Sequence, residues 1–221
     1  MKKSGYWLDI AIFVAIVVAD ALGFVPITQT LFIVPFIWIT LRLQRERWSS
    51  IGFSVPPGLI KLVGAGIAAG ILMELFAVYV TTPRISAFFG VEPDYSDFSA
   101  LQGNLQLLVI FIALSWVIAA FGEEICFRGF LMKRIAQVFG EGRWAWVTAL
   151  AASSVLFGWG HTEQGVSGWV QEGLSGFLLG VLFLLARRNL VVPIIAHGVS
   201  NTLAFVLIYF GNYPGIGAQA G

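Results

Sequence analysis

Residues 121–129 read FGEEICFRG, and this charged stretch lies inside an apolar segment of the chain. It contains two adjacent carboxylates, Glu123 and Glu124, and one guanidinium group, Arg128. Charged side chains within a membrane are costly and are retained mostly where they have a function. The stretch therefore predicts a polar functional site inside a membrane-spanning segment, with the other polar residues of the spans as candidate partners.

The composition indicates an integral membrane protein. Of the 221 residues, 58% are hydrophobic and 11% are charged, whereas soluble domains carry about 25% charged residues. The length suits one compact unit, so residues 1–221 are expected to form a single membrane domain. A net charge of +1 leaves no basic face for nucleic acid. The single cysteine, Cys126, excludes an internal disulfide framework.

The apolar runs predict an all-α fold, a polytopic transmembrane bundle of about seven to eight helices. A span needs about 20 residues, with about 17 as the lower limit. The predicted spans are residues 6–22, 24–41, 59–80, 104–138, 144–161, 173–186 and 190–210. Residues 81–103 are polar and are expected to lie outside the membrane, as a loop or with a short surface helix.

One predicted span is longer than the others. Residues 104–138 would reach about 50 Å as a single α-helix, which exceeds the hydrocarbon core of about 30 Å. Either its first turns project from the membrane, or the helix breaks near Gly122.

The distribution of basic residues predicts the orientation. Short loops rich in Lys and Arg usually remain in the cytoplasm. The amino terminus is therefore expected in the cytoplasm and the carboxyl terminus outside, in a prokaryotic cell membrane. The basic segments are residues 2–3, 42–47, 133–143 and 187–188, and they alternate with the acidic connections 81–103 and 162–172.

Both histidines of the chain lie in predicted spans. Counting 1.5 Å per residue from the basic ends places Glu123 at a depth of about 15 Å, His197 at about 13 Å and Asn201 at about 19 Å. The same count places His161 at about 27 Å. A deep funnel, or a helix that starts after Trp144, would bring His161 to the level of the others.

The spacing of these residues suggests a division of roles. Glu124 and Arg128 are four residues apart and can pair on one helix face, which leaves Glu123 unpaired. A buried glutamate next to a histidine can take a proton from water. A second histidine and an asparagine amide can donate hydrogen bonds to a developing oxyanion. Together these groups suit the attack of water on an amide without a covalent intermediate.

Three short motifs resemble those of the CPBP intramembrane proteases, a family that includes the Rce1-type CAAX prenyl endopeptidases and the bacterial Abi proteins. They lie in the core of residues 104–210, in the order and separation typical of the family. One motif alone would be weak evidence, whereas three in order form a specific signature. The motifs are Glu123-Glu124-x-x-x-Arg128, Phe157-x-x-x-His161 and His197-x-x-x-Asn201.

The resemblance implies a helical bundle whose polar cavity opens to the cytoplasmic side. It also implies a glutamate-dependent endopeptidase. Carried over to this chain, Glu123 and His161 would activate the water, and His197 and Asn201 would stabilise the oxyanion.

The same resemblance gives Glu124 and Arg128 a supporting role, as a pair that holds the site. No cofactor is expected. Zinc is the alternative, because glutamate and histidine can bind it. A zinc site needs three or four protein ligands in tetrahedral geometry, and the chain contains no HExxH motif, so the metal-free interpretation is favoured.

Each motif residue also has a purely structural interpretation. Glu123, Glu124 and Arg128 could form a buried ion cluster that locks two helices together. His161 and Asn201 could each form an ordinary hydrogen bond between helices.

Four other polar residues lie in the apolar segments. Cys126 occupies the variable middle of the first motif and is interpreted as a small packing residue rather than a nucleophile. Glu74, in the third span, could line the cavity or pair with a polar group elsewhere. Asp9 and Asp20 share a helix face and are expected to form hydrogen bonds within the bundle.

The favoured function is the hydrolysis of a hydrophobic or membrane-anchored peptide, prenylated or not, at the lipid bilayer. The alternative is a non-proteolytic scaffold or an immunity-type protein with a structural polar core. A third class is a transporter that relays protons, but paired discontinuous helices, which would favour transport, are not evident. The sequence leaves the substrate and the oligomeric state open.

Overall fold

The structure is a computed structural model, and it describes residues 3–214 and 216. The described residues are helical and include no strand, which confirms the all-α bundle. The α-helices are α1 (Lys3–Ala21), α2 (Thr30–Leu43), α3 (Leu59–Phe76), α4 (Thr82–Phe89), α5 (Leu105–Leu114), α6 (Met132–Val138), α7 (Arg143–Trp159), α8 (Gly165–Leu185) and α9 (Val191–Tyr209).

Two π-helical segments join neighbouring α-helices into long rods. Ala77–Thr81 joins α3 to α4, and Ser115–Leu131 joins α5 to α6. The described chain thus contains seven continuous helical rods, of which five are long and apolar enough to cross a membrane. The other two are α2, which is apolar but shorter, and α7.

The third predicted span is longer than expected. Residues 81–103 were expected to form a loop, alone or with a short surface helix, and the structure extends the third helix without a break through Thr81 to Phe89. Pro83 does not stop it, because the proline lies just after the π-helical segment Ala77–Thr81, where the regular α-helical hydrogen bonds are already interrupted. The helix ends at Gly90, whose φ of 71° requires the left-handed region that glycine adopts without strain.

The long segment does not break near Gly122, so that alternative is wrong. Residues 105–138 form one continuous rod with a π-helical centre. Gly122 instead lets this rod approach α2, because a Cβ atom at this position would lie 2.5 Å from Cγ2 of Thr30.

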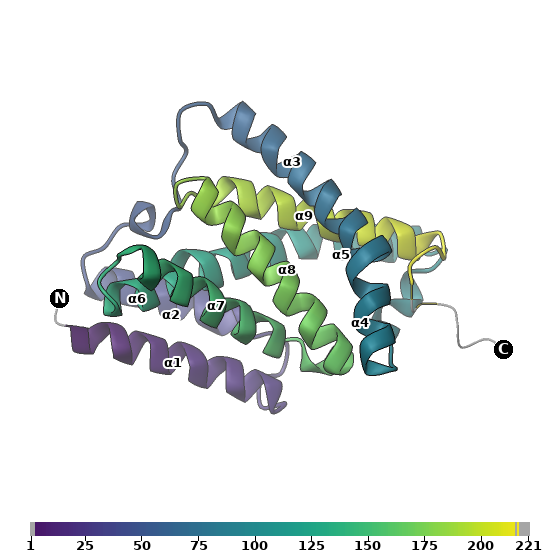
Figure 1. The fold of residues 1–221 in the computed structure, drawn as a ribbon, viewed down its shortest axis with the longest axis horizontal. Helices are drawn as coiled ribbons and strands as arrows, with labels where there is room; N and C mark the ends of the chain where they lie inside the picture. The colour runs from purple at the N-terminus through teal and green to yellow at the C-terminus, as the bar shows by residue number, and fades with distance from the viewer. Residues whose placement is uncertain (1–2, 215, 217–221) are drawn as a thin grey trace.

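Small residues bring the other helices together. In α3, a Cβ atom on Gly66 would lie 2.7 Å from Cβ of Ile195, and one on Gly70 would collide with the backbone of Ala196. The small residues of α3 thus form a close-packing face of the kind common in membrane helices. Figure 1 shows α3 crossing α9, with α8 running between this pair and the group of α1, α2, α6 and α7.

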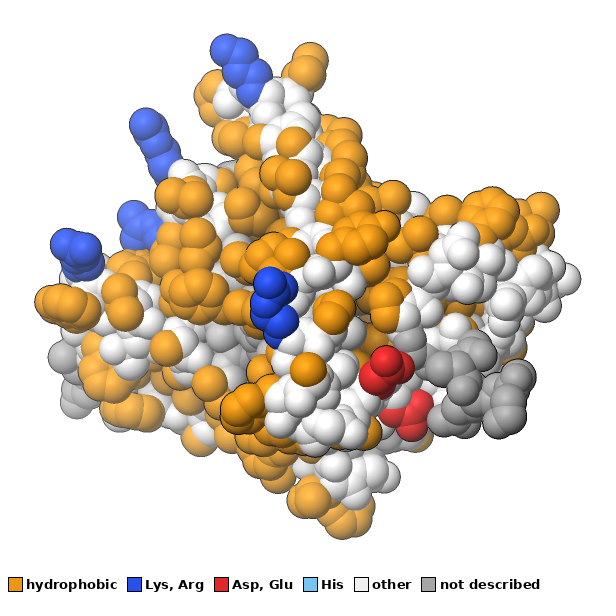
Figure 2. All heavy atoms as spheres, turned by 45° about the vertical axis from the view of Figure 1, so that its right-hand side comes forward, with side chains coloured by type: hydrophobic (Ala, Val, Ile, Leu, Met, Phe, Trp, Pro, Cys, Tyr) orange, Lys and Arg blue, Asp and Glu red, His pale blue; other side chains and the backbone are white. Residues whose placement is uncertain are grey.

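Charged side chains are unevenly distributed around the hydrophobic surface. The face drawn in Figure 2 is mostly hydrophobic, with most of its Lys and Arg toward the upper left and Asp and Glu at the lower right. An apolar belt with charges gathered toward its ends is what a lipid bilayer requires. The described chain is therefore built as an integral membrane protein.

Candidate active site

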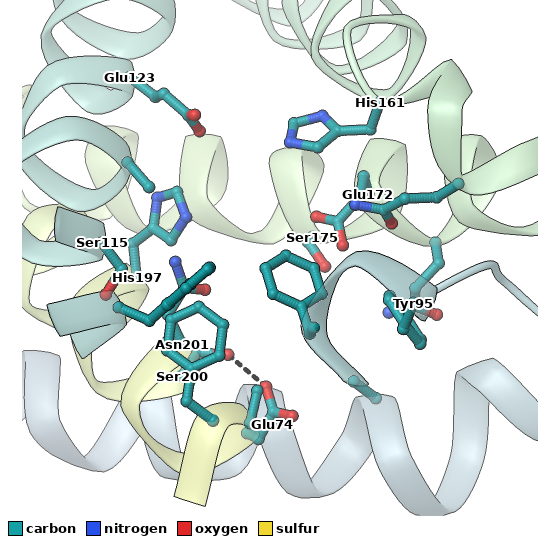
Figure 3. A pocket seen from close by; sticks show the side chains of 18 of the residues that line it. Glu74, Tyr95, Ser115, Glu123, His161, Glu172, Ser175, His197, Ser200 and Asn201 are labelled. Atoms are coloured by element: carbon teal, nitrogen blue, oxygen red, sulfur yellow. Dashed lines mark hydrogen bonds between the residues drawn. The ribbon is translucent and has the colours of Figure 1, made fainter. Parts of the chain in front are cut away.

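A cavity of about 480 Å³ contains all four predicted catalytic residues. Glu123, His161, His197 and Asn201 line it and come from the α5–α6 rod, the turn after α7 and the α9 helix. Figure 3 shows Glu123 and His161 on opposite sides of this space, with His197 and Asn201 below Glu123 on its side of the space. Residues more than 70 positions apart in the sequence are therefore gathered at one place.

Glu123 has a free carboxylate oxygen. It lies in the π-helical segment Ser115–Leu131 and is half-buried. Its Oε2 atom is buried and has no hydrogen-bond partner. This agrees with the prediction from the spacing that Glu123 stays unpaired while its neighbour pairs.

Glu124 is fully buried. Its Oε1 atom accepts hydrogen bonds from Nη1 of Arg128 and faces Nδ1 of His197, both at 2.9 Å. Nη2 of Arg128 in turn donates to the carbonyl oxygen of Gly176 on α8, at 2.9 Å. The predicted Glu124–Arg128 pair is present, and it also holds one of the two histidines.

The contact between Glu124 and His197 was not predicted. The two residues are 73 positions apart, and i,i+4 spacing describes neighbours within one helix only. A carboxylate can only accept a hydrogen bond when ionised, so Nδ1 of His197 carries the hydrogen in that form. The other ring nitrogen, Nε2, is then the one available to the cavity.

His161 lies just beyond the end of α7. The helix starts at Arg143 and ends at Trp159, so a late start does not explain the depth of His161. The cavity instead extends to the end of α7. Nδ1 of His161 lies 2.9 Å from the carbonyl oxygen of Phe157. A carbonyl only accepts, so Nδ1 donates and Nε2 is left free.

Phe157 packs against both histidines. Its ring centroid lies 4.9 Å from that of His161 and 6.2 Å from that of His197. The guanidinium carbon of Arg128 lies 4.3 Å from the same ring, which is a cation–π distance. Phe157 itself is buried. One aromatic side chain therefore fixes three polar groups of the site relative to one another.

His197 and Asn201 project from the same face of α9. A glycine between them, Gly198, makes room for the indole of Trp116, since a Cβ atom there would lie 2.6 Å from the ring. The indole Nε1 donates to Oγ1 of Thr202, at 3.0 Å. The helix that carries the second histidine is thereby held against the rod that carries Glu123.

Two further carboxylates line the cavity from helices, and a third, Glu163, lines it from a connection. Glu74 of α3 lies among the lining residues and also accepts a hydrogen bond from Oγ of Ser200, at 2.6 Å. Both interpretations offered for Glu74 therefore hold. Glu172 lies on α8. It was not a candidate because residues 162–172 were interpreted as a connection, whereas α8 starts at Gly165.

Three other polar residues singled out in the sequence, Cys126, Asp9 and Asp20, are not among the residues that line the cavity. Cys126 is fully buried in the hydrophobic core, as expected of a packing residue. Asp9 pairs with Arg134 and accepts from Gln44. Asp20 accepts from the backbone amide of Gln29. The prediction that the two aspartates form hydrogen bonds within the bundle is confirmed.

The rim of the cavity is formed by connections at one end of the bundle. They contribute Ile27, Tyr95, Glu163 and Tyr213. Burial raises the pKa of the Tyr95 and Tyr213 hydroxyl groups, which therefore stay neutral and can donate hydrogen bonds. These connections lie at the end that carries the acidic segments 81–103 and 162–172, which the distribution of basic residues places outside. A cavity open to the cytoplasm and a cytoplasmic amino terminus are therefore incompatible predictions.

Fold and site together define a helical membrane protein with glutamate, histidine and asparagine side chains gathered in one cavity. Residues 105–203 match the family of type II CAAX prenyl endopeptidases described as Rce1-like. The match covers all three motifs and confirms the resemblance to the CAAX proteases, a family of peptidases. Searches of curated proteins and of solved structures gave no match.

Proposed function

We propose that this protein is an intramembrane endopeptidase that hydrolyses peptide bonds of a hydrophobic or membrane-anchored peptide. The observation that carries the proposal is the position of Glu123, with an unpartnered carboxylate oxygen, opposite His161 in the cavity (Figure 3). Two proton acceptors that face one space can hold and deprotonate a water molecule between them.

In the proposed reaction, Glu123 takes a proton from water while Nε2 of His161 orients it. The hydroxide attacks the carbonyl carbon of the peptide bond and forms a tetrahedral intermediate. Collapse of this intermediate breaks the C–N bond, and the proton held by Glu123 passes to the leaving amine. Water is thus divided between the new carboxyl group and the new amine, without a covalent enzyme intermediate.

His197 and Asn201 are proposed to bind the oxyanion. In its doubly protonated form, His197 donates through Nδ1 to Glu124 and through Nε2 to the oxyanion. The amide of Asn201, one helical turn further along α9, provides a second donor. Donors that are already in position lower the barrier most, and the Glu124–Arg128 pair holds His197 in place.

We further propose that the reaction needs no metal. Among the described residues, no three His, Cys, Asp or Glu side chains are grouped so that they could hold a metal ion. Zinc sites use three or four protein ligands. The arrangement of these donors therefore does not fit a zinc centre.

The test uses purified protein and a fluorescently labelled hydrophobic peptide, offered with and without a prenyl group. Replacement of Glu123 by alanine is expected to abolish cleavage, whereas replacement of the exposed Glu141 by alanine is expected to leave it unchanged. A chelator is expected to have no effect. Cleavage that survives Glu123→Ala would refute the proposed mechanism, and loss with chelator that zinc restores would refute the metal-free reaction.

A further inference from the structure

The cavity wall away from Glu123 is acidic. Glu74, Glu163 and Glu172 line the cavity in addition to Glu123, and no Lys or Arg is found among the described lining residues. Figure 3 shows Glu74 and Glu172 approaching the cavity from two different helices. Carboxylates in a low-dielectric space repel one another unless a cation is present. The proposed water-activating pair accounts for only one of these four carboxylates.

Glu74 also has an unsatisfied oxygen atom. The residue is only 5% exposed, and its Oε2 atom accepts the hydrogen bond from Ser200. Its Oε1 atom is buried without a hydrogen-bond partner. A buried acceptor left without a donor costs about 1–3 kcal/mol, and more when it is charged. The hydroxyl of Tyr213 lies near this carboxylate, but no hydrogen bond to Oε1 is formed, so this oxygen remains open to a donor from a bound ligand.

We propose that Glu74 and Glu172 form a subsite that binds a cationic group of the peptide substrate. The group is an ammonium or a guanidinium, because each combines positive charge with several N–H donors. This inference rests on the proposed function, since it assigns a substrate feature to the same cavity. A neutral donor would satisfy Oε1 of Glu74 but would leave the carboxylates uncompensated.

The subsite adjoins the proposed oxyanion site. Ser200, which holds Glu74, directly precedes Asn201 on α9. The cationic group is therefore expected within a few residues of the bond that is cut. The cavity is also lined by Phe98, Phe111 and Phe205, which suit apolar residues in the rest of the peptide.

Two parts of a peptide could supply the cation. One is the side chain of Lys or Arg, and the other is the free α-amino group at the amino terminus. The shared chemistry is a protonated nitrogen, and acetylation of the peptide distinguishes the two sources.

The experiment measures binding of fluorescent apolar peptides to the full-length Glu123→Gln protein, so that no peptide is consumed. One set is acetylated and carries a single Lys, moved one position at a time. A matched peptide has norleucine in place of Lys, and a third has norleucine and a free amino terminus. We expect a Lys peptide or the free-amine peptide to bind at least about tenfold more tightly than the acetylated norleucine peptide.

Adding Glu74→Gln or Glu172→Gln to the Glu123→Gln protein is expected to reduce the affinity ratio between the cationic and the acetylated norleucine peptides to about one. Adding Glu141→Gln, an equal charge change at the opposite end, is expected to preserve this ratio. Two independent variants keep the test decisive if one of them fails to fold. Equal binding of all peptides, or a preference that survives both Glu74→Gln and Glu172→Gln, would overturn the subsite. If no cleavage depends on Glu123 but the protein still prefers peptides with a cationic group, the peptidase proposal is refuted. The cation site is then retained.

Discussion

At the scale of single residues, two adjacent glutamates have opposite environments. Oε1 of Glu124 contacts both an arginine and a histidine, whereas Oε2 of Glu123 has no partner. One carboxylate is therefore fixed as a support, and its neighbour keeps the freedom to exchange a proton. The alternative of a purely structural ion cluster accounts for Glu124 and Arg128 but leaves the free oxygen of Glu123 unexplained.

Replacement of Glu124 by glutamine should damage both stability and activity. The buried Arg128 would lose its counter-charge, which typically costs about 3–5 kcal/mol, and His197 would lose the partner of its Nδ1 atom. We expect a lower unfolding temperature in detergent and a loss of peptide cleavage on the order of 100-fold.

The double variant Glu124→Gln/Arg128→Met separates these two effects. Removal of both charges should restore much of the unfolding temperature, because an apolar replacement of a buried ion pair is often neutral. It should not restore cleavage, since His197 remains without its carboxylate. Recovered cleavage in the double variant would argue against a positioning role for Glu124.

Arg134 shows a different use of buried charge. It is fully buried, although its sequence position suggested a basic cytoplasmic connection. Its guanidinium pairs with Asp9 at 2.9 Å and with Glu46 at 3.0 Å, and Nη2 donates to Gln44 at 2.8 Å. The network ties α1 and the segment after α2 to α6.

Replacement of Arg134 by alanine is therefore expected to destabilise the protein by about 3–5 kcal/mol, because two carboxylates lose their cation. The exposed Arg143 is the control, and its replacement by alanine should change stability by less than about 0.5 kcal/mol. Thermal unfolding in detergent measures both. Equal effects of the two substitutions would show that the network contributes little.

At the scale of helices, the sequence predicts contacts within a helix better than contacts between helices. The Glu124–Arg128 pair and the shared face of His197 and Asn201 follow from a spacing of four residues. The contact between Glu124 and His197 depends on how two rods cross, and residue spacing within one helix does not determine that crossing. The position of Glu172 was missed for a related reason, since the glycine-containing first turns of α8 resemble a connection.

The π-helical centre of the α5–α6 rod likewise has no local sequence signal. It spans Ser115–Leu131 and carries Glu123, Glu124 and Arg128. Such helices are usually single turns and are frequent at functional sites. The unusual segment and the charged stretch coincide.

Close packing of α7 on α8 should be sensitive to a single methyl group. A Cβ atom on Gly158 would lie 2.8 Å from Cα of Gly173 and would also collide with the carbonyl oxygen of Trp169. Both are backbone atoms, so the helices would have to separate. We expect Gly158→Ala to destabilise the protein by about 1–3 kcal/mol and to reduce cleavage, because His161 follows the end of α7.

Gly64 on α3 provides the matched control, since a Cβ atom there would meet nothing within 4 Å. Gly64→Ala should be neutral or stabilising by about 0.5–1 kcal/mol, as expected for alanine in a helix. Unfolding temperatures of the two variants test the contrast. A tolerated Gly158→Ala would mean that α7 and α8 are less tightly packed than described.

At the scale of the whole molecule, the position of the cavity relative to the charged ends determines where substrates approach. Its exposed lining residues Ile27 and Glu163 belong to connections at the acidic end. Most of the exposed basic residues lie at the opposite end, including Arg143 at the start of α7 and Arg187 in the connection between α8 and α9. If the basic end is cytoplasmic, the cavity opens on the outer side of the membrane.

We therefore predict that a cysteine at Ile27 reacts with a membrane-impermeant maleimide in intact cells, in a Cys126→Ser background. A cysteine at Arg187 should react only after the membrane is permeabilised. The expected difference follows from the uneven distribution of Lys and Arg, since short connections rich in these residues usually remain in the cytoplasm. The reverse pattern would place the cavity mouth in the cytoplasm, as the family resemblance implies, and would show that the distribution of Lys and Arg does not set the orientation of this chain.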